Sequence, residues 1–333
     1  MEIVPCIFCR SEERLTEEHV FAAFMGGELT VKNGSCNTCN ESFGRAEATI
    51  KDATIPLLNL LKIENRDGKV PNAPVNAEIR NVDMKNLPGF MDGSGNIKLC
   101  DHVREIVDDD GKKIKKGFFV TQKASETFAD RELKRGGKLI ERDVPKEIVI
   151  EADYMQGIIF AFTLETRKIA AKIALAAIAL EQGIPFALSS CFDKLRTIRD
   201  ETDIHKLPIR IFANENIMSA WLHTPYQHSV LCYLSVGMKK GWALVTLFGG
   251  LSYLVEVVDN YAEANSRQFN IFYDARTKTR ENRVILADEM TLIGHVLSPA
   301  TKFEDRDSVD AQWYPVVAAF CADKGTVVER IKS

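Results

Sequence analysis

The amino-acid sequence predicts an α+β protein: a small zinc-stapled N-terminal module, then a larger region with one long helix on a mostly antiparallel sheet. Three observations lead to this fold class. Two CxxC pairs fall within the first 39 residues, an Ala-rich helical stretch spans about residues 154–182, and five β-branched or alternating runs lie between residues 208 and 273. One helix followed by a series of strands favours packing of the helix on the sheet.

Length and composition are those of an ordinary soluble globular protein. The chain has 333 residues, enough for two domains or three small ones, with 45% apolar and 27% charged residues. Its formal net charge is -4, so no overall basic field attracts nucleic acid. Any contact with DNA must therefore be made by a local surface.

The sequence favours a cytoplasmic protein that does not cross a membrane. It lacks a basic-then-apolar leader at the N-terminus. The longest uncharged stretch, residues 216–238, contains Pro225 and two histidines, which a spanning helix tolerates poorly. In a reducing compartment the cysteines are expected as thiols or metal ligands rather than as disulfides.

The two CxxC pairs predict a closed metal site. Cys6 and Cys9 are followed after 26 residues by Cys36 and Cys39, and two such pairs complete a tetrahedral four-cysteine zinc site. With all four positions filled by sulfur, this zinc has no place for water and is structural. A redox role for either CxxC pair is the alternative. The remaining cysteines are interpreted as buried apolar side chains or inert thiols, namely Cys100, Cys191, Cys232 and Cys321.

Turn signals and composition divide the chain into three parts, residues 1–62, 63–150 and 151–333. In the first part, residues 46–61 fit one helical face, with a kink or restart expected at Pro56. The second part reads as a loop-rich, β-containing insert or linker. Its short strands are expected at Asn96–Leu99, Gly117–Thr121 and Glu147–Ile150.

The third part should contain a long helix over Tyr154–Gln182, closed by Gly183 with Pro185 just beyond. Lys168 and Lys172 lie four apart on this helix, where such pairs usually keep one face solvated; a phosphate-facing role is the alternative. The strands after the helix are expected at Pro208–Ala213, His228–Val236, Trp242–Phe248, Ser252–Val258 and Phe269–Tyr273.

The segment between and just after the cysteine pairs carries a second motif. It reads LTEEHVFAAFMGG, then Asn33, and then NESFG directly after Cys39. With both CxxC pairs in this order, about 45 N-terminal residues resemble the HNH endonucleases of the ββα-metal type, in particular the branch stapled by a four-cysteine zinc. The resemblance implies a metal-dependent endonuclease that hydrolyses DNA phosphodiester bonds.

The resemblance also implies a role for each matching residue. His19 matches the general base that deprotonates the attacking water, a task that suits a neutral imidazole near pH 7. Glu18 and Asn40 match the ligands of a hydrated divalent metal, Mg²⁺ or Mn²⁺, that offsets charge on the phosphate. Asn33 matches the middle asparagine, which orients the histidine.

Three positions depart from the family pattern. Glu18 stands where Asp is commoner, Asn40 where many relatives have His, and Phe43 where a phosphate-binding Lys often stands, a contact for which Arg45 is a substitute. Residues 1–50 also carry eight acidic and four basic side chains, so the module should bind duplex DNA weakly by itself.

The rest of the chain is therefore the expected source of DNA affinity or control. The densest basic stretch, Arg131–Lys146, either supplies a DNA contact or is a solvated helix and turn. The C-terminal part has no motif of its own and reads as a targeting, sensing or oligomerising domain. Its histidines are expected to be packed or surface residues rather than metal ligands, and its tryptophans core anchors or interface residues, namely His205, His223, His228, His295, Trp221 and Trp313.

Two functional hypotheses follow. The first is an HNH endonuclease acting on DNA, as a homodimer or with an activating partner or ligand; by analogy alone, the arrangement is similar to bacterial restriction and phage-defence effectors. The second is a zinc-ribbon adaptor that has lost cleavage and binds nucleic acid or a protein. Convergence of Glu18, His19 and Asn40 would favour the enzyme.

Overall fold

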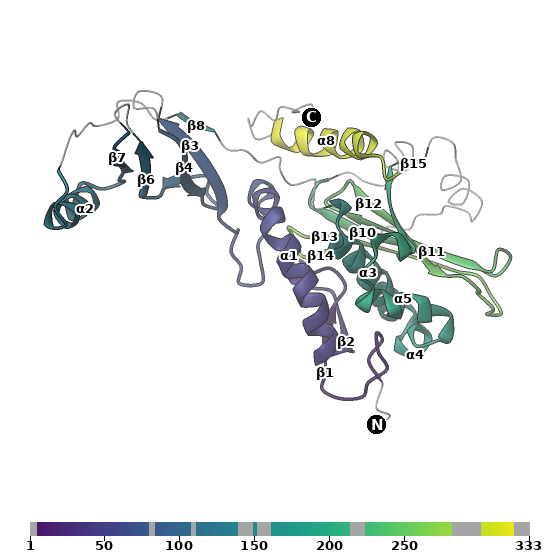
Figure 1. Cartoon of the computed structure of the whole chain (residues 1–333). Coiled ribbons are helices and arrows are strands. Elements are labelled where there is room, and N and C mark those ends of the chain that lie inside the picture. Colours follow the sequence, from purple (N-terminus) through teal and green to yellow (C-terminus); the bar gives the residue numbers. More distant parts are fainter. Residues whose placement is uncertain are drawn as a thin grey trace. The chain divides into compact units, whose positions relative to one another are not determined.

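The computed structural model describes residues 5–79, 84–107, 111–138, 149–151, 161–213, 224–281 and 301–322. It forms two compact units. The first contains residues 1–54, 63–68 and 157–333, and the second contains residues 55–62 and 69–156. Mixed helices and antiparallel sheets confirm the predicted α+β class (Figure 1). Among the described helices, none is long and apolar enough to cross a bilayer.

The chain begins with the predicted ββα arrangement. Strands β1 (Leu15–His19) and β2 (Thr30–Cys36) pair antiparallel, with a bulge between Thr16 and Glu18. Helix α1 (Asn37–Leu61) follows β2 directly. It continues through Pro56 instead of restarting there, so one helix joins the module to the second unit.

A seven-stranded antiparallel sheet dominates the first unit, in the order β14-β13-β10-β11-β12-β9-β15. The five strands predicted from sequence are all present, with ends displaced by at most two residues. They are β9 (Ile209–Ala213), β10 (Gln227–Ser235), β11 (Lys240–Leu247), β12 (Leu251–Val258) and β13 (Arg267–Asp274). Two short strands complete the sheet, β14 (Thr279–Glu281) and β15 (Lys302–Phe303).

The long helix α3 (Leu164–Gln182) packs on this sheet and ends as predicted, at Gly183 with φ 87°. It begins later than residue 154, because the Thr163 hydroxyl caps it by accepting from the amide of Thr166; residues 152–160 lie outside the described part. The short helices α4 (Ile184–Ala187) and α5 (Asp193–Thr197) follow (Figure 1). Helix α8 (Arg306–Ala322) lies against β9.

The N-terminal module and the C-terminal sheet share one core. Phe21 stacks on His228 of β10 and on Tyr273 of β13, with ring centroids 5.3 and 5.7 Å apart. The Tyr273 hydroxyl donates to the carbonyl of Gly26 at 2.8 Å and accepts from the amide of Glu28 at 3.0 Å. The module up to Thr54 therefore belongs to the same compact unit as the C-terminal sheet.

The GG of the motif has a packing reason. Gly26 has φ 82°, and a Cβ there would lie 2.7 Å from the carbonyl oxygen of Ala275, at the end of β13. A Cβ on Gly27 would lie 2.0 Å from the carbonyl oxygen of Phe21. Gly26 needs glycine because its backbone lies in the left-handed region, and both positions need it because a side chain would run into neighbouring backbone.

The structure places most of the single histidines, tryptophans and cysteines that the sequence analysis named. His228 is buried, with Nε2 3.1 Å from the Met25 carbonyl oxygen and Nδ1 accepting from the Phe248 amide, and Trp313 is buried and donates to the Phe248 carbonyl. Cys232 is buried, as expected, whereas Cys100 and Cys191 are half-buried. His205 is exposed, as a surface histidine is. The side chains of His223, His295, Trp221 and Cys321 lie outside the described part.

The second unit contains a small sheet of order β5-β4-β3-β8 and a separate hairpin. The sheet strands are β3 (Ala73–Ile79), β4 (Met84–Met91), β5 (Ile97–Leu99) and β8 (Val149–Glu151). The hairpin strands are β6 (His102–Val107) and β7 (Lys113–Phe118), and helix α2 (Gln122–Lys134) follows.

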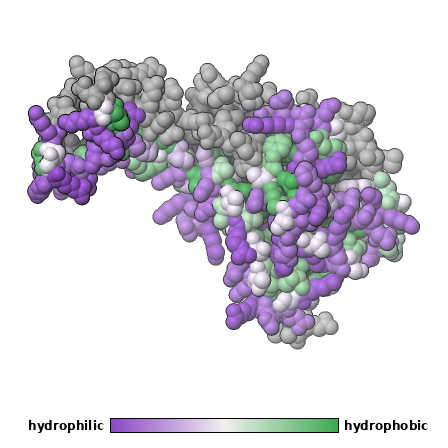
Figure 2. Space-filling view, viewed as in Figure 1, coloured by the Kyte–Doolittle hydropathy of each residue, from purple (hydrophilic) through white to green (hydrophobic). Residues whose placement is uncertain are grey.

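The strand predicted over Gly117–Thr121 ends early, because the Thr121 side chain caps α2 by accepting from the amide of Ala124. Helix α2 buries no residue, and its surface in Figure 2 is largely hydrophilic. The first half of the predicted basic stretch, up to Lys138, lies on and just after this exposed helix; residues 139–146 lie outside the described part.

Candidate functional site

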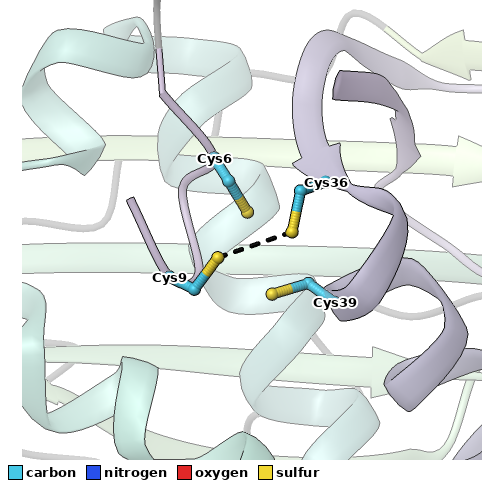
Figure 3. Close-up of side chains that lie close together, drawn as sticks. All are labelled: Cys6, Cys9, Cys36 and Cys39. Carbon is cyan, nitrogen blue, oxygen red and sulfur yellow. Dashed lines mark hydrogen bonds between the residues drawn. The ribbon is translucent and has the colours of Figure 1, made fainter. Parts of the chain in front are cut away.

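The four paired cysteines converge on one point (Figure 3). Their sulfur atoms all lie within 4.8 Å of one another, and the Sγ atoms of Cys9 and Cys36 are 3.4 Å apart and not bonded. Tetrahedral Zn–S bonds of ~2.3 Å place sulfurs ~3.8 Å apart, so the cluster has the dimensions of a zinc site. Among the described His, Cys, Asp and Glu side chains, no other group is as suitable for a metal.

Local backbone bonds shape the first half of this cluster. The amide of Cys6 donates to the carbonyl of Ser11, and the amide of Arg10 donates to the carbonyl of Cys6, which closes a tight turn with φ 61° at Arg10. The Phe8 amide points at the Cys6 sulfur, at 3.4 Å. The side-chain hydrogen bond between Cys6 and Cys39 lowers the pKa of the Cys6 thiol, which favours a thiolate at one member of this pair.

A residue that the sequence did not indicate supports the cluster from the C-terminal part. Arg199, in the short 3-10 helix Ile198–Asp200, donates from Nη1 to the sulfur of Cys39 at 3.0 Å. A four-thiolate zinc site carries a net charge of about -2, so a guanidinium in contact with one sulfur offsets part of that charge. The bond connects residues 160 positions apart.

Glu18 is buried in an ion-pair cluster. Its side chain is 1% exposed, and its Oε1 lies 2.7 Å from Nζ of Lys172, which is 4% exposed. The same ammonium lies 2.6 Å from Oε1 of Glu47 on α1. The expectation that Lys172 keeps a helix face solvated is therefore wrong: α3 turns this residue toward the module. Lys168, one turn earlier, donates to the carbonyl of Arg199 instead.

The charges of this cluster follow from burial and pairing. Burial favours a neutral Lys172, but Glu18 and Glu47 outweigh it and raise the pKa of Lys172, so the ammonium is charged at neutral pH. Burial raises the pKa of Glu18, and Lys172 opposes that shift. The Oε2 atom of Glu18 is buried and has no hydrogen-bond partner.

His19, the next residue, is half-buried, and its Nδ1 atom is also buried without a hydrogen-bond partner. Burial lowers the pKa of His19; the cations of Lys172 and Arg66 lower it further, and Glu47 acts in the opposite direction. The imidazole is thus neutral at pH 7. Two unpartnered polar atoms, one carboxylate oxygen and one imidazole nitrogen, therefore belong to consecutive residues of β1.

The two asparagines of the motif lie nearby on different elements. Asn40, in the first turn of α1, is exposed, and its Nδ2 lies 3.5 Å from the hydroxyl of Thr16, two residues before Glu18. Asn33 is exposed on β2 with φ 55°, near the bulge. It does not bond Nδ1 of His19, since that atom has no partner.

The departure at Phe43 has a structural reason. Its ring is 4% exposed and packs against Phe8, with 4.7 Å between ring centroids. Phe43 thus supports the loop that carries Cys6 and Cys9. A lysine there would bury its charge. Arg45, two residues later on α1, is exposed.

Comparison with known proteins identifies the family of this segment. Residues 6–49 match the HNH endonuclease family, which confirms the resemblance seen in the sequence for the N-terminal module. The match includes the four cysteines and the motif residues from Glu18 to Asn40, and it supports nuclease activity in general. No curated protein and no solved structure matches the chain.

Proposed function

We propose that this protein is a metal-dependent HNH endonuclease that hydrolyses phosphodiester bonds in DNA. The observation that carries the proposal is the pair of unpartnered buried atoms on consecutive residues, Oε2 of Glu18 and Nδ1 of His19, within the segment that matches the family. Buried polar atoms without partners are uncommon in folded proteins and often mark a place where a ligand binds.

The residues present fit a hydrated divalent cation. Glu18 offers a carboxylate oxygen that no protein group occupies, and Asn40 offers an amide oxygen on the neighbouring helix turn. Bound Mg²⁺ or Mn²⁺ would supply a Lewis acid that offsets charge on the phosphate. His19, neutral at pH 7, accepts the proton of the attacking water. The four cysteines hold a structural zinc.

Duplex DNA is the proposed substrate. Because the module is acidic, binding requires basic contacts from another part of the chain. Arg131, Lys134 and Arg135 lie at the exposed end of α2, but Glu132 pairs with both arginines and reduces their field. We therefore assign DNA affinity or control to the chain beyond residue 62, in a cytoplasmic protein that acts as a homodimer or with an activating partner. A role in restriction or phage defence rests on analogy with similar arrangements.

Wild-type protein with Mg²⁺ or Mn²⁺ should nick or cut plasmid DNA, and His19→Ala should reduce the rate by about 10³-fold, as expected for loss of a general base. Agarose gels of supercoiled plasmid over time measure the rate, and metal analysis should show equal zinc in both proteins. Equal rates for wild type and His19→Ala would refute the assignment of His19.

The rate should depend on pH in a way set by His19. Because the pKa of its imidazole is below 6.5, the base stays unprotonated down to that pH, and kcat/KM should fall only at more acid pH. Initial rates at saturating Mn²⁺ between pH 5 and pH 8 measure this. An acid limb centred above pH 6.5 would contradict the buried, cation-flanked environment.

One observation favours a second candidate, a zinc-ribbon adaptor that has lost cleavage. Lys172 already neutralises one oxygen of Glu18, the residue expected to bind the catalytic metal. An adaptor would bind nucleic acid or a protein with the same affinity with or without Mn²⁺, and it would leave single-stranded, duplex and modified DNA intact. The cleavage assay separates the two candidates directly.

A further inference from the structure

Three elements place a cation between two carboxylates beside the proposed metal site. Nζ of Lys172 on α3 lies 2.7 Å from Oε1 of Glu18 on β1 and 2.6 Å from Oε1 of Glu47 on α1. Glu47 and Lys172 are not part of the motif, and Lys172 lies outside the segment that matches the family. The C-terminal part of the chain thus contributes a side chain to the module.

Without the ammonium, this position would suit a divalent cation. Two carboxylates that each approach one point within 2.7 Å are hard oxygen ligands, the kind that Mg²⁺ and Mn²⁺ prefer. With the ammonium present, a metal ion cannot occupy the same space and is repelled from it. Glu18 then has one atom left to offer, the buried and unpartnered Oε2.

The ammonium is fixed in this position by packing. Residues Ile169–Ala179 of α3 are all buried. The module is held to the same unit by the Phe21 stack, the Tyr273 hydroxyl and the contact between Arg199 and Cys39. The Lys172 backbone therefore stays beside the module, and its ammonium is held by the two ion pairs.

We propose that Lys172 is a positioning residue of the nuclease site: it fills the space between Glu18 and Glu47 and restricts the catalytic metal to Oε2 of Glu18, beside His19. This inference rests on the proposed function, because it specifies where the metal of that reaction binds. It also gives the C-terminal part a definite role, which is to supply the Lys172 ammonium. In the module alone, the carboxylates of Glu18 and Glu47 would both be free to chelate a metal ion.

Lys172→Met in the full chain tests the proposal. Mn²⁺ titrated without DNA, by calorimetry or electron paramagnetic resonance, should bind about tenfold more tightly than in wild type, because both carboxylates become free to chelate it. Cleavage at saturating Mn²⁺ should nevertheless fall about tenfold or more, because the metal moves toward Glu47. A purely structural role for Lys172 would weaken binding and cleavage together.

Two further variants isolate the cause. Lys168→Met makes the same change one turn earlier, on a lysine that bonds a backbone carbonyl, and should leave both quantities as in wild type. In Lys172→Met combined with Glu47→Gln, the second carboxylate is gone, so the gain in Mn²⁺ affinity should disappear. A folded Lys172→Met variant that binds Mn²⁺ no more tightly than wild type would overturn the proposal.

Lys172→Met leaves the buried Glu18 and the half-buried Glu47 without a counter-ion and can fail to fold, so a measurement on wild type is also needed. Anomalous diffraction from Mn²⁺-soaked wild-type crystals should place the ion at Oε2 of Glu18 with Lys172 unmoved. An ion between Glu18 and Glu47, with Lys172 displaced, would overturn the inference. Wild type that cleaves no DNA although Lys172→Met tightens Mn²⁺ binding would instead overturn the proposed function alone.

Discussion

Cys39→Ser is expected to abolish stoichiometric zinc binding and to lower the free energy of unfolding by at least about 3 kcal/mol. Cys39 is fully buried, and all four sulfurs are needed to close the site. Structural zinc contributes on the order of 10 kcal/mol in isolated zinc fingers. The loss should be smaller here, because the module also packs on the C-terminal sheet through Phe21 and Tyr273. The substitution also leaves Arg199 without its thiolate.

Elemental analysis and urea unfolding at pH 7 measure the two quantities. Cys100→Ser is the matched control, since it makes the same change at a half-buried cysteine outside the cluster and should retain zinc. Wild-type protein purified without zinc, and with a disulfide within either CxxC pair, Cys6–Cys9 or Cys36–Cys39, would contradict the structural-zinc assignment. That result would favour the redox alternative.

Acid is expected to destabilise the protein by about 3 kcal/mol between pH 6.5 and pH 4 through one residue, His228. Burial lowers the pKa of His228 to about 4, against 6.5 for an unfolded chain. Between these values the unfolded state binds a proton that the folded state does not. The contribution to stability is therefore present above pH 6.5 and is lost as pH falls to 4, at about 1.4 kcal/mol per pKa unit.

Urea unfolding of wild type and His228→Gln, at pH 7 and at pH 4.5, measures this effect. Glutamine does not titrate, so the variant should be less stable than wild type at pH 7 but should lose less stability on acidification. His205→Gln, at an exposed position, should lose as much unfolding free energy between pH 7 and pH 4.5 as wild type does. If His228→Gln loses as much unfolding free energy between pH 7 and pH 4.5 as wild type does, the acid sensitivity belongs to other groups.

Local patterns predicted most of the fold. The cysteine spacing, the GG turn and the motif around His19 are contiguous, and strands β10, β11 and β12 are joined by short turns, so each could be recognised within a short window. Two errors lie at boundaries set by side-chain caps, whereas strands β3, β4 and β6 and helix α8 were not predicted at all. Thr163 starts α3 and Thr121 starts α2, and propensity alone does not locate such caps.

Contacts distant in sequence could not be predicted in the same way. Glu47 and Arg199 look like ordinary surface residues in the sequence, and their partners are 125 and 160 positions away. Lys172 did leave a signal, because it stands in the middle of the apolar run IAAKIALAAIAL. A charged side chain within a helix that is too apolar to be exposed needs a counter-ion. The acidic excess of residues 1–50 indicates that this counter-ion lies in the N-terminal module.

The link between Glu47 and Lys172 has a consequence for synthesis of the chain. The module leaves the ribosome first, yet the lysine that fills its carboxylate pair is made 125 residues later. At typical elongation rates this delay is about 10 s. During that interval Glu18 and Glu47 lack this counter-ion. The protein thus acquires its proposed single-metal geometry only when α3 docks, late in translation.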